Sequence, residues 1–193
     1  TSGHRLAARK FDGLPEEEII IHNDSLPRVM DVLGDEGAGL ALSKLKNVLF
    51  VQSGNRSAAC TLIEGRFPQI RNVIPQDDES CTMQISVDEA RQVLGRARQL
   101  ELRKLSDGAI ACGLRFKRED GGIKVNGKAS DDFIACDGGI DGTEVAMDAR
   151  YLSDLLGACK SEHISWQCAD EKSANLFRDG KNGVFHVVMP MQL

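Results

Sequence analysis

The sequence predicts an α+β fold built from a repeated unit that combines helices with several strands. The order helix, strand, strand, strand occurs twice in the 193 residues. The two helices begin at residues 24 and 148, an offset of 124, and a proline ends each copy at residues 68 and 190, an offset of 122. A further helix with its own strands precedes the second copy only. Recurrence at a fixed period indicates copies of one structural unit.

The first copy begins with a helix at Asp24. Apolar residues recur there at the helical spacing i, i+3, i+4, i+7, namely Leu26, Val29, Met30 and Leu33. Asp24 or Ser25 can cap the start of this helix, and Gly34 can end it. Strand-like runs follow at residues 39–42, 47–53 and 57–64.

The second copy repeats this order from Asp148. Its predicted helix carries one apolar face, made of Tyr151, Leu152, Leu155, Leu156 and Cys159. Strand-like runs follow at residues 163–168, 173–177 and 183–189. Sequence identity between the two copies is low, so the repeat is one of architecture.

The additional half begins at a capping box, Ser86-Val87-Asp88-Glu89, in which the Ser hydroxyl and the Glu carboxylate satisfy backbone N–H groups. Its helix continues through Ala90, Val93, Leu94, Ala97 and Leu100, and strand-like runs follow at 108–117, 122–125 and 132–136, with a turn at Gly121-Gly122. We therefore predict a complete unit at residues 76–193 and the C-terminal half of another at residues 1–75. Half a unit cannot close its own core, so residues 1–75 are expected to need upstream sequence or compensating contacts.

Composition sets broad limits on location and on partners. The chain is 41% hydrophobic and 27% charged. It holds no apolar run near the roughly 18 residues that span a membrane, and no signal-peptide pattern. We therefore expect a cytoplasmic protein with no membrane partner. The net charge of −5 excludes only a uniformly basic nucleic-acid-binding protein, because an acidic protein can still have one basic wall.

The six cysteines form no CxxC pair, and no His stands at metal-ligand spacing from any of them. Most lie within apolar runs, so we predict reduced, buried thiols and no metal site. Two nucleophile hypotheses remain open as alternatives. One is an N-terminal-nucleophile hydrolase that uses Thr1 with its own amine as the base, and the other pairs a Cys with His4 or His186. No hydrolase pattern accompanies either, and a buried thiol would be weakly reactive.

Three segments together resemble a known family. Residues 3–7, GHRLA, resemble the segment DGHRLA of the bacterial DNA polymerase III β sliding clamps. Residues 64–75, EGRFPQIRNVIP, resemble DGRFPDYRRVLP, and residues 187–193, VVMPMQL, resemble VVMPMRL. The three occur in the family's order and at its approximate separations. The whole chain resembles the second half of domain two followed by domain three.

The resemblance implies the DNA-clamp (processivity) fold, in which each repeated domain packs two helices on antiparallel β-sheets. It implies a head-to-tail homodimeric ring, when full length, that encircles and slides on duplex DNA during replication and repair. It implies neither enzymatic activity nor a cofactor. A naturally short, clamp-like decoy that binds partners without encircling DNA is the alternative.

The resemblance also implies a hydrophobic interdomain pocket. DNA polymerase subunits, the clamp loader and repair proteins would dock there through short linear peptides that carry Leu and Phe anchors. The implied pocket residues are Thr1, Gly3, His4, Arg5, Leu6, Pro68, Val73, Val187, Val188, Met189, Pro190, Met191 and Leu193, with Tyr151 and Ser173 at the edge. Met side chains suit a groove with several partners because they repack easily. Asn72 and Gln192 stand where the family has basic residues, so acidic peptides should bind less well. The alternative interpretation of residues 187–193 is a final core strand.

Two further surfaces are expected on the predicted helix at residue 86. Arg91, Arg96 and Arg98 could meet DNA phosphates without sequence readout, and a solvated helix face is the alternative. The resemblance places the ring interface at Gln99 and Leu100, with Asp131 and Asp132 nearby. Residues 21–24 lack the basic residues of the family, so weak DNA contact is expected there.

Overall fold

The computed structural model describes residues 3–9, 19–33, 40–101, 103–104, 110–181 and 183–192. The chain forms two compact units. The larger unit joins Thr1–Asp12 to Ile70–Leu193, and the smaller unit is Gly13–Gln69. The start of the chain thus belongs with its C-terminal part. The division into domains at residue 75 stays a prediction. No helix in the described residues is long and apolar enough to span a membrane.

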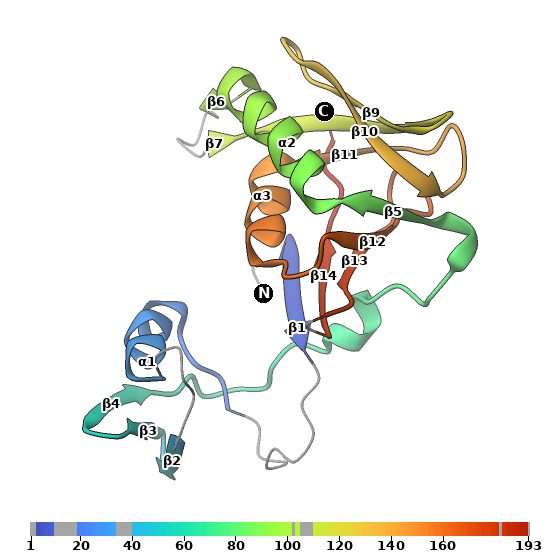
Figure 1. Ribbon diagram of the computed structural model, residues 1–193. Coiled ribbons are helices and arrows are strands. Elements are labelled where there is room, and N and C mark those ends of the chain that lie inside the picture. The colour runs from blue at the N-terminus through green and yellow to red at the C-terminus, as the bar shows by residue number, and fades with distance from the viewer. Residues whose placement is uncertain are drawn as a thin grey trace. The chain divides into compact units, whose positions relative to one another are not determined.

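The larger unit holds most of the helices and strands. Its elements are β1 (Arg5–Arg9), the 3-10 turns η2 (Ile70–Val73) and η3 (Glu79–Cys81), β5 (Thr82–Ser86), α2 (Val87–Glu101), β6 (Arg103–Lys104), β7 (Ile110–Ala111), β8 (Gly113–Glu119), β9 (Gly122–Asn126), β10 (Asp131–Gly138), β11 (Glu144–Asp148), α3 (Ala149–Ala158), β12 (His163–Gln167), β13 (Asn175–Asp179) and β14 (Val184–Val188). Nine of the strands form one sheet in the order β1-β14-β13-β12-β5-β10-β9-β8-β11 (Figure 1). All their pairings are antiparallel. The predicted α+β class is therefore confirmed.

The larger unit consists of two halves that exchange strands. The strand before α2, β5, pairs with β12 of the second half, and the strand before α3, β11, pairs with β8 of the first half. The two registers follow one rule. His163 starts β12 and lies opposite Ser86, the residue before α2, while Gly113 starts β8 and lies opposite Asp148, the residue before α3. The helices α2 and α3 pack against each other.

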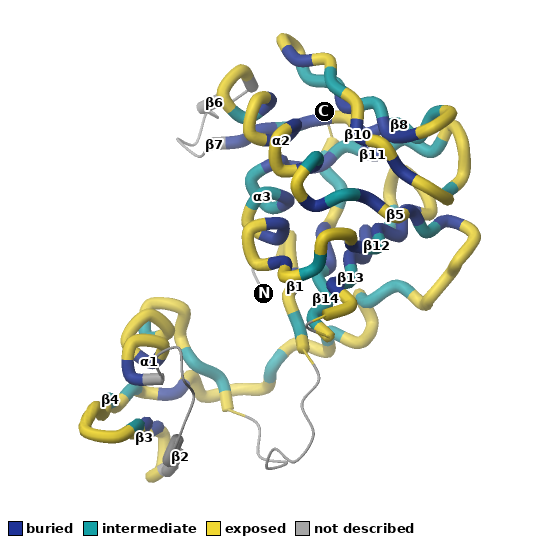
Figure 2. The backbone as a smooth tube through the Cα atoms, viewed as in Figure 1, coloured by how far each residue is buried: buried dark blue, intermediate teal, exposed yellow. Residues whose placement is uncertain are grey.

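One hydrophobic core holds this unit together. The buried face of α2 carries Ala90, Val93, Leu94 and Ala97, and that of α3 carries Leu152, Leu155 and Leu156, largely as the helical spacing predicts. Trp166 of β12 stacks on Phe177 and meets Phe116 edge to face, at ring-centroid distances of 5.1 and 5.5 Å. Figure 2 shows the buried residues along the two helices and the central strands. Burial of this apolar surface is the main stabilising contribution.

The helix caps agree only in part with the predictions. Asp148 caps α3 by accepting a hydrogen bond from the N–H of Arg150 at 2.9 Å. At α2, the Ser86 hydroxyl accepts from the N–H of Glu89 at 3.4 Å, but the Glu89 carboxylate accepts from the N–H of Ala135 on β10 at 3.2 Å. The predicted reciprocal capping box is therefore half wrong, because a neighbouring strand offers the carboxylate another backbone donor.

The smaller unit has the predicted helix and three strands. They are η1 (Asn23–Ser25), α1 (Leu26–Leu33), β2 (Leu40–Leu45), β3 (Val48–Ser53) and β4 (Arg56–Thr61), with the sheet order β2-β3-β4. The small buried core comprises Val29, Val32, Leu49, Val51 and Leu62.

The apolar face of α1 differs from its prediction. Val29 is buried as expected and Val32 joins it, but Leu26 is exposed and Met30 is 60% exposed. The apolar surface of α1 is wider than the part that packs on β3 and β4, which explains the difference. The 3-10 turn η1, which leads directly into α1, is capped by His22, whose Nδ1 accepts from the N–H of Asp24.

Candidate functional site

Two predicted segments from opposite ends of the sequence meet in the larger unit. β1 pairs with β14 in antiparallel register, with Arg5 opposite Val188 and Leu6 opposite Val187. The hydrogen bond from the N–H of Met189 to the carbonyl of His4, 2.9 Å long, extends this pairing beyond the strands. Figure 1 shows β1 beside β14. The structure therefore brings residues 3–6 and 187–189 together.

A row of apolar side chains crosses three strands at this junction. Leu6 of β1 lies opposite Val187 of β14, and Val187 lies opposite Leu176 of β13. These three residues are buried and form a cluster of their own, against which Ile70 and Ile74 pack. Directly opposite side chains on neighbouring strands are close enough to stabilise each other. The row is thus packed and buried. A third residue of the predicted pocket, Val188, belongs to the main core.

Exposed apolar residues flank this row. Val73, in η2 between the two packed isoleucines, is 47% exposed. Met189, the first residue after β14, is 36% exposed. Flexible Met and small Val side chains at such a border can contact an apolar ligand without a large rearrangement. An apolar surface therefore continues from the buried row to solvent.

Tyr151 of α3 forms a second border of the junction. The ring of His4 lies nearly parallel to it, with 6.3 Å between centroids, and the guanidinium of Arg5 lies 4.9 Å from the Tyr151 centroid. Arg5 also forms an ion pair with Asp154, one turn further along α3. A cation over an aromatic ring contributes about 0.5–1 kcal/mol at an exposed site. These contacts tie the turn before β1 to the start of α3.

Arg150 also lies near the ring of Tyr151. Its guanidinium lies 5.8 Å from the Tyr151 ring and donates to both carboxylate oxygens of Asp148. These hydrogen bonds raise the pKa of Arg150 above its ordinary value. The cap of α3 and the orientation of Tyr151 therefore depend on the same ion pair.

The residues after β14 hydrogen-bond to β11, the edge strand of the sheet opposite to β1. The N–H of Met191 donates to the carbonyl of Ala146 in β11 at 2.8 Å. β1 and β11 are the two edge strands of the nine-stranded sheet. Residues 189–191, with Pro190 at their centre, thus hydrogen-bond to segments at both edges. Pro190 restricts the backbone of this tail and lowers the entropy that ordering it costs.

Ser173 has a defined local role. Its hydroxyl and its N–H donate to the Asp170 carboxylate at 2.8 and 2.7 Å. Hydrogen bonds from the N–H of Lys172 and from Ser173 lower the pKa of Asp170. The next residue, Ala174, packs against the Leu6 cluster, so Ser173 lies beside the junction.

The remaining predicted pocket residues are placed less completely. Gly3 precedes β1 with a positive φ of 77°, which glycine adopts without strain. Thr1 and Leu193 lie outside the described residues. Pro68 belongs to the smaller unit, and its place beside the other pocket residues stays a prediction.

Two of the arginines predicted to face DNA have partners within the larger unit. Arg91 donates to the carbonyl of Leu156 at 2.7 and 3.2 Å and to that of Cys159 at 3.4 Å, so it satisfies carbonyls at the end of α3. Arg96 donates twice to the Asp132 carboxylate, at 2.7 and 3.1 Å. Residues predicted for two different surfaces, DNA contact and ring interface, therefore neutralise each other.

The other predicted residues near α2 lie toward solvent. Arg98 is half-buried, Gln99 is exposed and Leu100 is 59% exposed. Asp131 accepts a hydrogen bond from the side-chain amide of Asn126 at 3.0 Å. The DNA-facing and ring-interface assignments stay predictions.

The cysteines are free, and all except Cys60 are buried. Burial raises the pKa of Cys159 to about 11 and that of Cys168 to about 12, and it also raises the pKa values of Cys81 and Cys136. Thiols with raised pKa values are poor nucleophiles at neutral pH, which argues against a Cys–His pair built on them. The prediction that most of the thiols are buried is confirmed. Among the described residues, no cluster of His, Cys, Asp or Glu is arranged to hold a metal ion.

Comparison with known proteins found relatives that match this chain over its whole length. No family model matches. The β sliding clamp of Proteus mirabilis is 26% identical over 205 residues, covering 100% of this chain and 53% of the relative. The solved β sliding clamp of Caulobacter crescentus superposes with a TM-score of 0.86 at 22% identity, covering 100% of this chain and 53% of that one. The Pseudomonas aeruginosa clamp, solved bound to griselimycin, gives a TM-score of 0.83 at 21% identity, with coverage of 100% and 53%.

The chain spans about half the length of these relatives. Their likeness in sequence agrees with the three motifs at residues 3–7, 64–75 and 187–193. The high TM-scores agree with the helices and antiparallel strands described above. This chain therefore resembles bacterial β sliding clamps in sequence and has the DNA-clamp fold over the half of those proteins that it spans.

Proposed function

We propose that the junction of β1, β14 and α3 is a docking groove for short linear peptides. The partners are DNA polymerase subunits, the clamp loader and DNA repair proteins, which would use the groove to reach DNA through a processivity clamp. The observation that carries this proposal is the pairing of Leu6 with Val187, because it unites two of the three motifs shared with sliding clamps. Docking of this kind requires no catalysis, and we place it in the cytoplasm.

The proposed groove would combine a rigid, buried floor with adaptable borders. The buried row of Leu6, Val187 and Leu176 fixes the floor, while Met189 and Val73 offer exposed apolar contacts. An extended peptide with Leu and Phe anchors would cover these borders. Each anchor that becomes fully buried contributes about 1.5–3 kcal/mol, which suits the micromolar affinity of a transient partner.

Charge around the groove bears on which peptides bind. The guanidinium of Arg5 is paired with Asp154 and that of Arg150 with Asp148. Asn72 and Gln192 add no positive charge at positions where the family has basic residues. A carboxylate on the peptide would therefore have to compete with an existing ion pair. We expect apolar anchors to decide affinity and acidic flanks to add little.

The same proposal includes duplex DNA as a non-specific partner of a complete homodimeric ring. A clamp that slides needs weak phosphate contacts, because tight contacts would halt it. The ion pair of Arg96 with Asp132 and the hydrogen bonds of Arg91 to α3 limit what these two side chains could give to phosphates. Arg98 is then the arginine of the three for which DNA contact is most readily tested.

The groove can be tested by fluorescence polarisation with a labelled peptide that carries Leu and Phe anchors. Met189→Ala removes an exposed apolar contact, so we expect affinity to fall about tenfold. The matched control is Ile140→Ala, which trims an exposed apolar residue between β10 and β11. If both variants bind the peptide as the unmodified chain does, the groove is not the docking site.

A further inference from the structure

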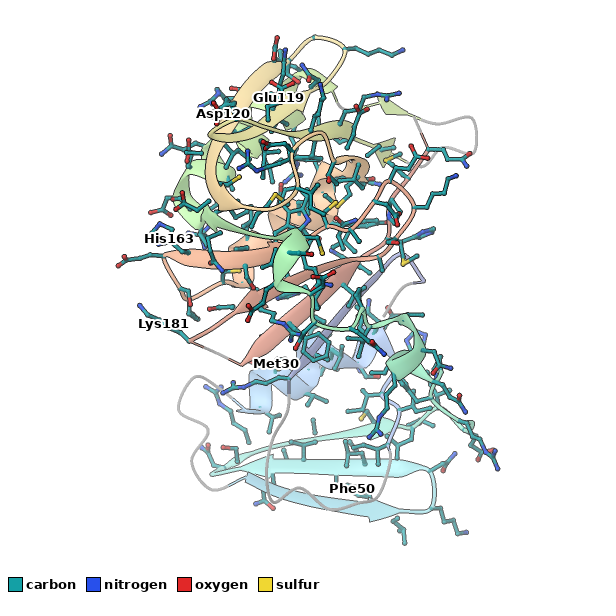
Figure 3. All side chains as sticks on the ribbon, turned by 90° about the vertical axis from the view of Figure 1, so that its right-hand side faces the viewer. Met30, Phe50, Glu119, Asp120, His163 and Lys181 are labelled. Carbon is teal, nitrogen blue, oxygen red and sulfur yellow. The ribbon has the colours of Figure 1, made fainter. Side chains whose placement is uncertain are left out.

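Two buried cysteines lie opposite each other at one end of a strand pair in the larger unit. In the pairing of β12 with β5, Gln167 lies opposite Thr82, so the same register places Cys168 opposite Cys81. The N–H of Cys168 donates to the carbonyl of Cys81 at 3.0 Å, which extends the backbone ladder to this pair. Figure 3 shows His163, the first residue of β12, which lies at the other end of the same ladder.

The two thiols lie close together on one face of the sheet. Side chains at directly opposite positions of antiparallel strands point to the same face. Cys81 is 1% exposed and Cys168 is 3% exposed. Burial is the main cause of the raised pKa of Cys168, and the nearby Cys81 thiol raises it further. Opposite residues joined by a backbone hydrogen bond have Cα atoms about 5.5 Å apart, within the range of about 4.4–6.8 Å that a disulfide spans.

We propose that Cys81 and Cys168 are a redox pair that hydrogen peroxide converts into a cross-strand disulfide, which stabilises the larger unit. The thiolate of one cysteine attacks an oxygen of the peroxide, the O–O bond breaks, and a sulfenic acid and a water form. The second thiol attacks the sulfenyl sulfur, the S–O bond breaks, and a second water leaves. The two thiols thus lose two protons and two electrons, and one peroxide is reduced to two waters.

The surroundings of the thiols predict a slow reaction. The thiol of Cys81 donates to the carbonyl of Asp78 at 3.5 Å, and that of Cys168 donates to the carbonyl of Asp170 at 4.0 Å. Thiols are weak donors, so rotation of the two sulfur atoms toward each other gives up little hydrogen-bond energy. Burial raises both pKa values, and the two carboxylates add to this effect. Because the thiolate is the attacking form, oxidation at neutral pH should take on the order of hours.

The disulfide would connect two turns of the larger unit. Cys81 ends η3, and Cys168 precedes the turn in which the Asp170 carboxylate accepts from the N–H of Ser173 at 2.7 Å. A covalent bond at this point restricts the unfolded chain between the two cysteines and opposes opening of the turn after β12. The oxidised larger unit should therefore be more stable than the reduced one.

Peptide mapping of the whole chain without reduction tests the pairing. The folded chain is incubated with hydrogen peroxide, the remaining thiols are alkylated, and the digest is analysed by mass spectrometry. We expect one linked pair of peptides, containing Cys81 and Cys168, that separates after reduction. Oxidation in concentrated urea is the control for the role of the fold, because an unfolded chain should give a mixture of cysteine pairings.

Urea unfolding followed by Trp166 fluorescence measures the effect of the disulfide. The oxidised chain should unfold at a urea concentration at least about 1 M above that of the reduced chain. Cys168→Ala should abolish this shift. Cys136→Ala is the matched control and should retain it, since Cys136 is also buried but lies opposite Ile85 of β5.

Three results would overturn the proposal. One is that Cys81 and Cys168 remain thiols after a treatment that oxidises Cys60, the cysteine that is not buried. Another is that the folded chain gives the same mixture of pairings as the chain in urea. The third is an equal unfolding midpoint for the oxidised and the reduced chain. The map uses the unmodified chain, so it decides the pairing even where Cys168→Ala does not fold.

Discussion

Leu6→Ala is the substitution that most directly tests the junction of the two chain ends. Leu6 is buried against Val187 and Leu176, and Ile70 and Ile74 pack on the same cluster. Truncation of a buried leucine to alanine costs about 2–5 kcal/mol, from lost apolar burial and from the cavity left behind. β1 is an edge strand and can relax toward its partner. We therefore expect a loss near the lower end, about 2–3 kcal/mol.

Urea unfolding followed by tryptophan fluorescence measures this loss in the larger unit. Trp166, the single tryptophan, is buried in the core of that unit, so its emission reports on the larger unit and not on the smaller one. The control is Leu100→Ala, an exposed leucine on α2 whose truncation should change stability by less than about 0.5 kcal/mol.

Hydrogen exchange separates local from global effects of Leu6→Ala. Amides of β1 should lose protection more than those of β12, because an edge strand can detach while the centre of the sheet remains folded. A stability loss no larger than that of Leu100→Ala would show that β1 does not dock on β14. The proposed groove would then have no floor.

Three further predictions follow from burial and backbone geometry. In the folded chain, Cys60 should react first with a thiol reagent at pH 8, and Cys168 should stay protected until unfolding because burial raises its pKa to about 12. Gly122→Ala should lower the free energy of unfolding by at least about 2 kcal/mol, since an added Cβ would lie 2.4 Å from the carbonyl oxygen of Ile134. Gly95→Ala in α2 places its Cβ in open space and should raise the free energy of unfolding by about 0.5–1 kcal/mol. Urea unfolding measures both changes. Burial lowers the pKa of His186 below 6.5, so the unfolded chain binds a proton on this imidazole at a higher pH than the folded chain does. The free energy of unfolding should therefore fall as the pH drops from 7 toward the folded pKa. His186→Gln should flatten that part of the plot of stability against pH.

The sequence by itself determined the helices and most strands. The apolar spacing of α2 and α3, and the caps Asp148 and Ser86, depend on residues three or four positions apart, so a single segment contains the whole signal. The three short motifs likewise indicated the resemblance to sliding clamps before any fold was known. Local contacts leave a local pattern.

Only the tertiary structure decided which strands pair, which charged side chains form ion pairs and which apolar side chains are covered. β1 was not predicted as a strand, because its partner β14 lies at the far end of the chain. β5 and β11 were missed for the same reason, since each is defined by a strand of the other half. The ion pair of Arg96 with Asp132 and the exposure of Met30 also depend on neighbours distant in sequence. Pairing between strands and the covering of a helix face are properties of two segments at once, so no pattern within one segment can specify them.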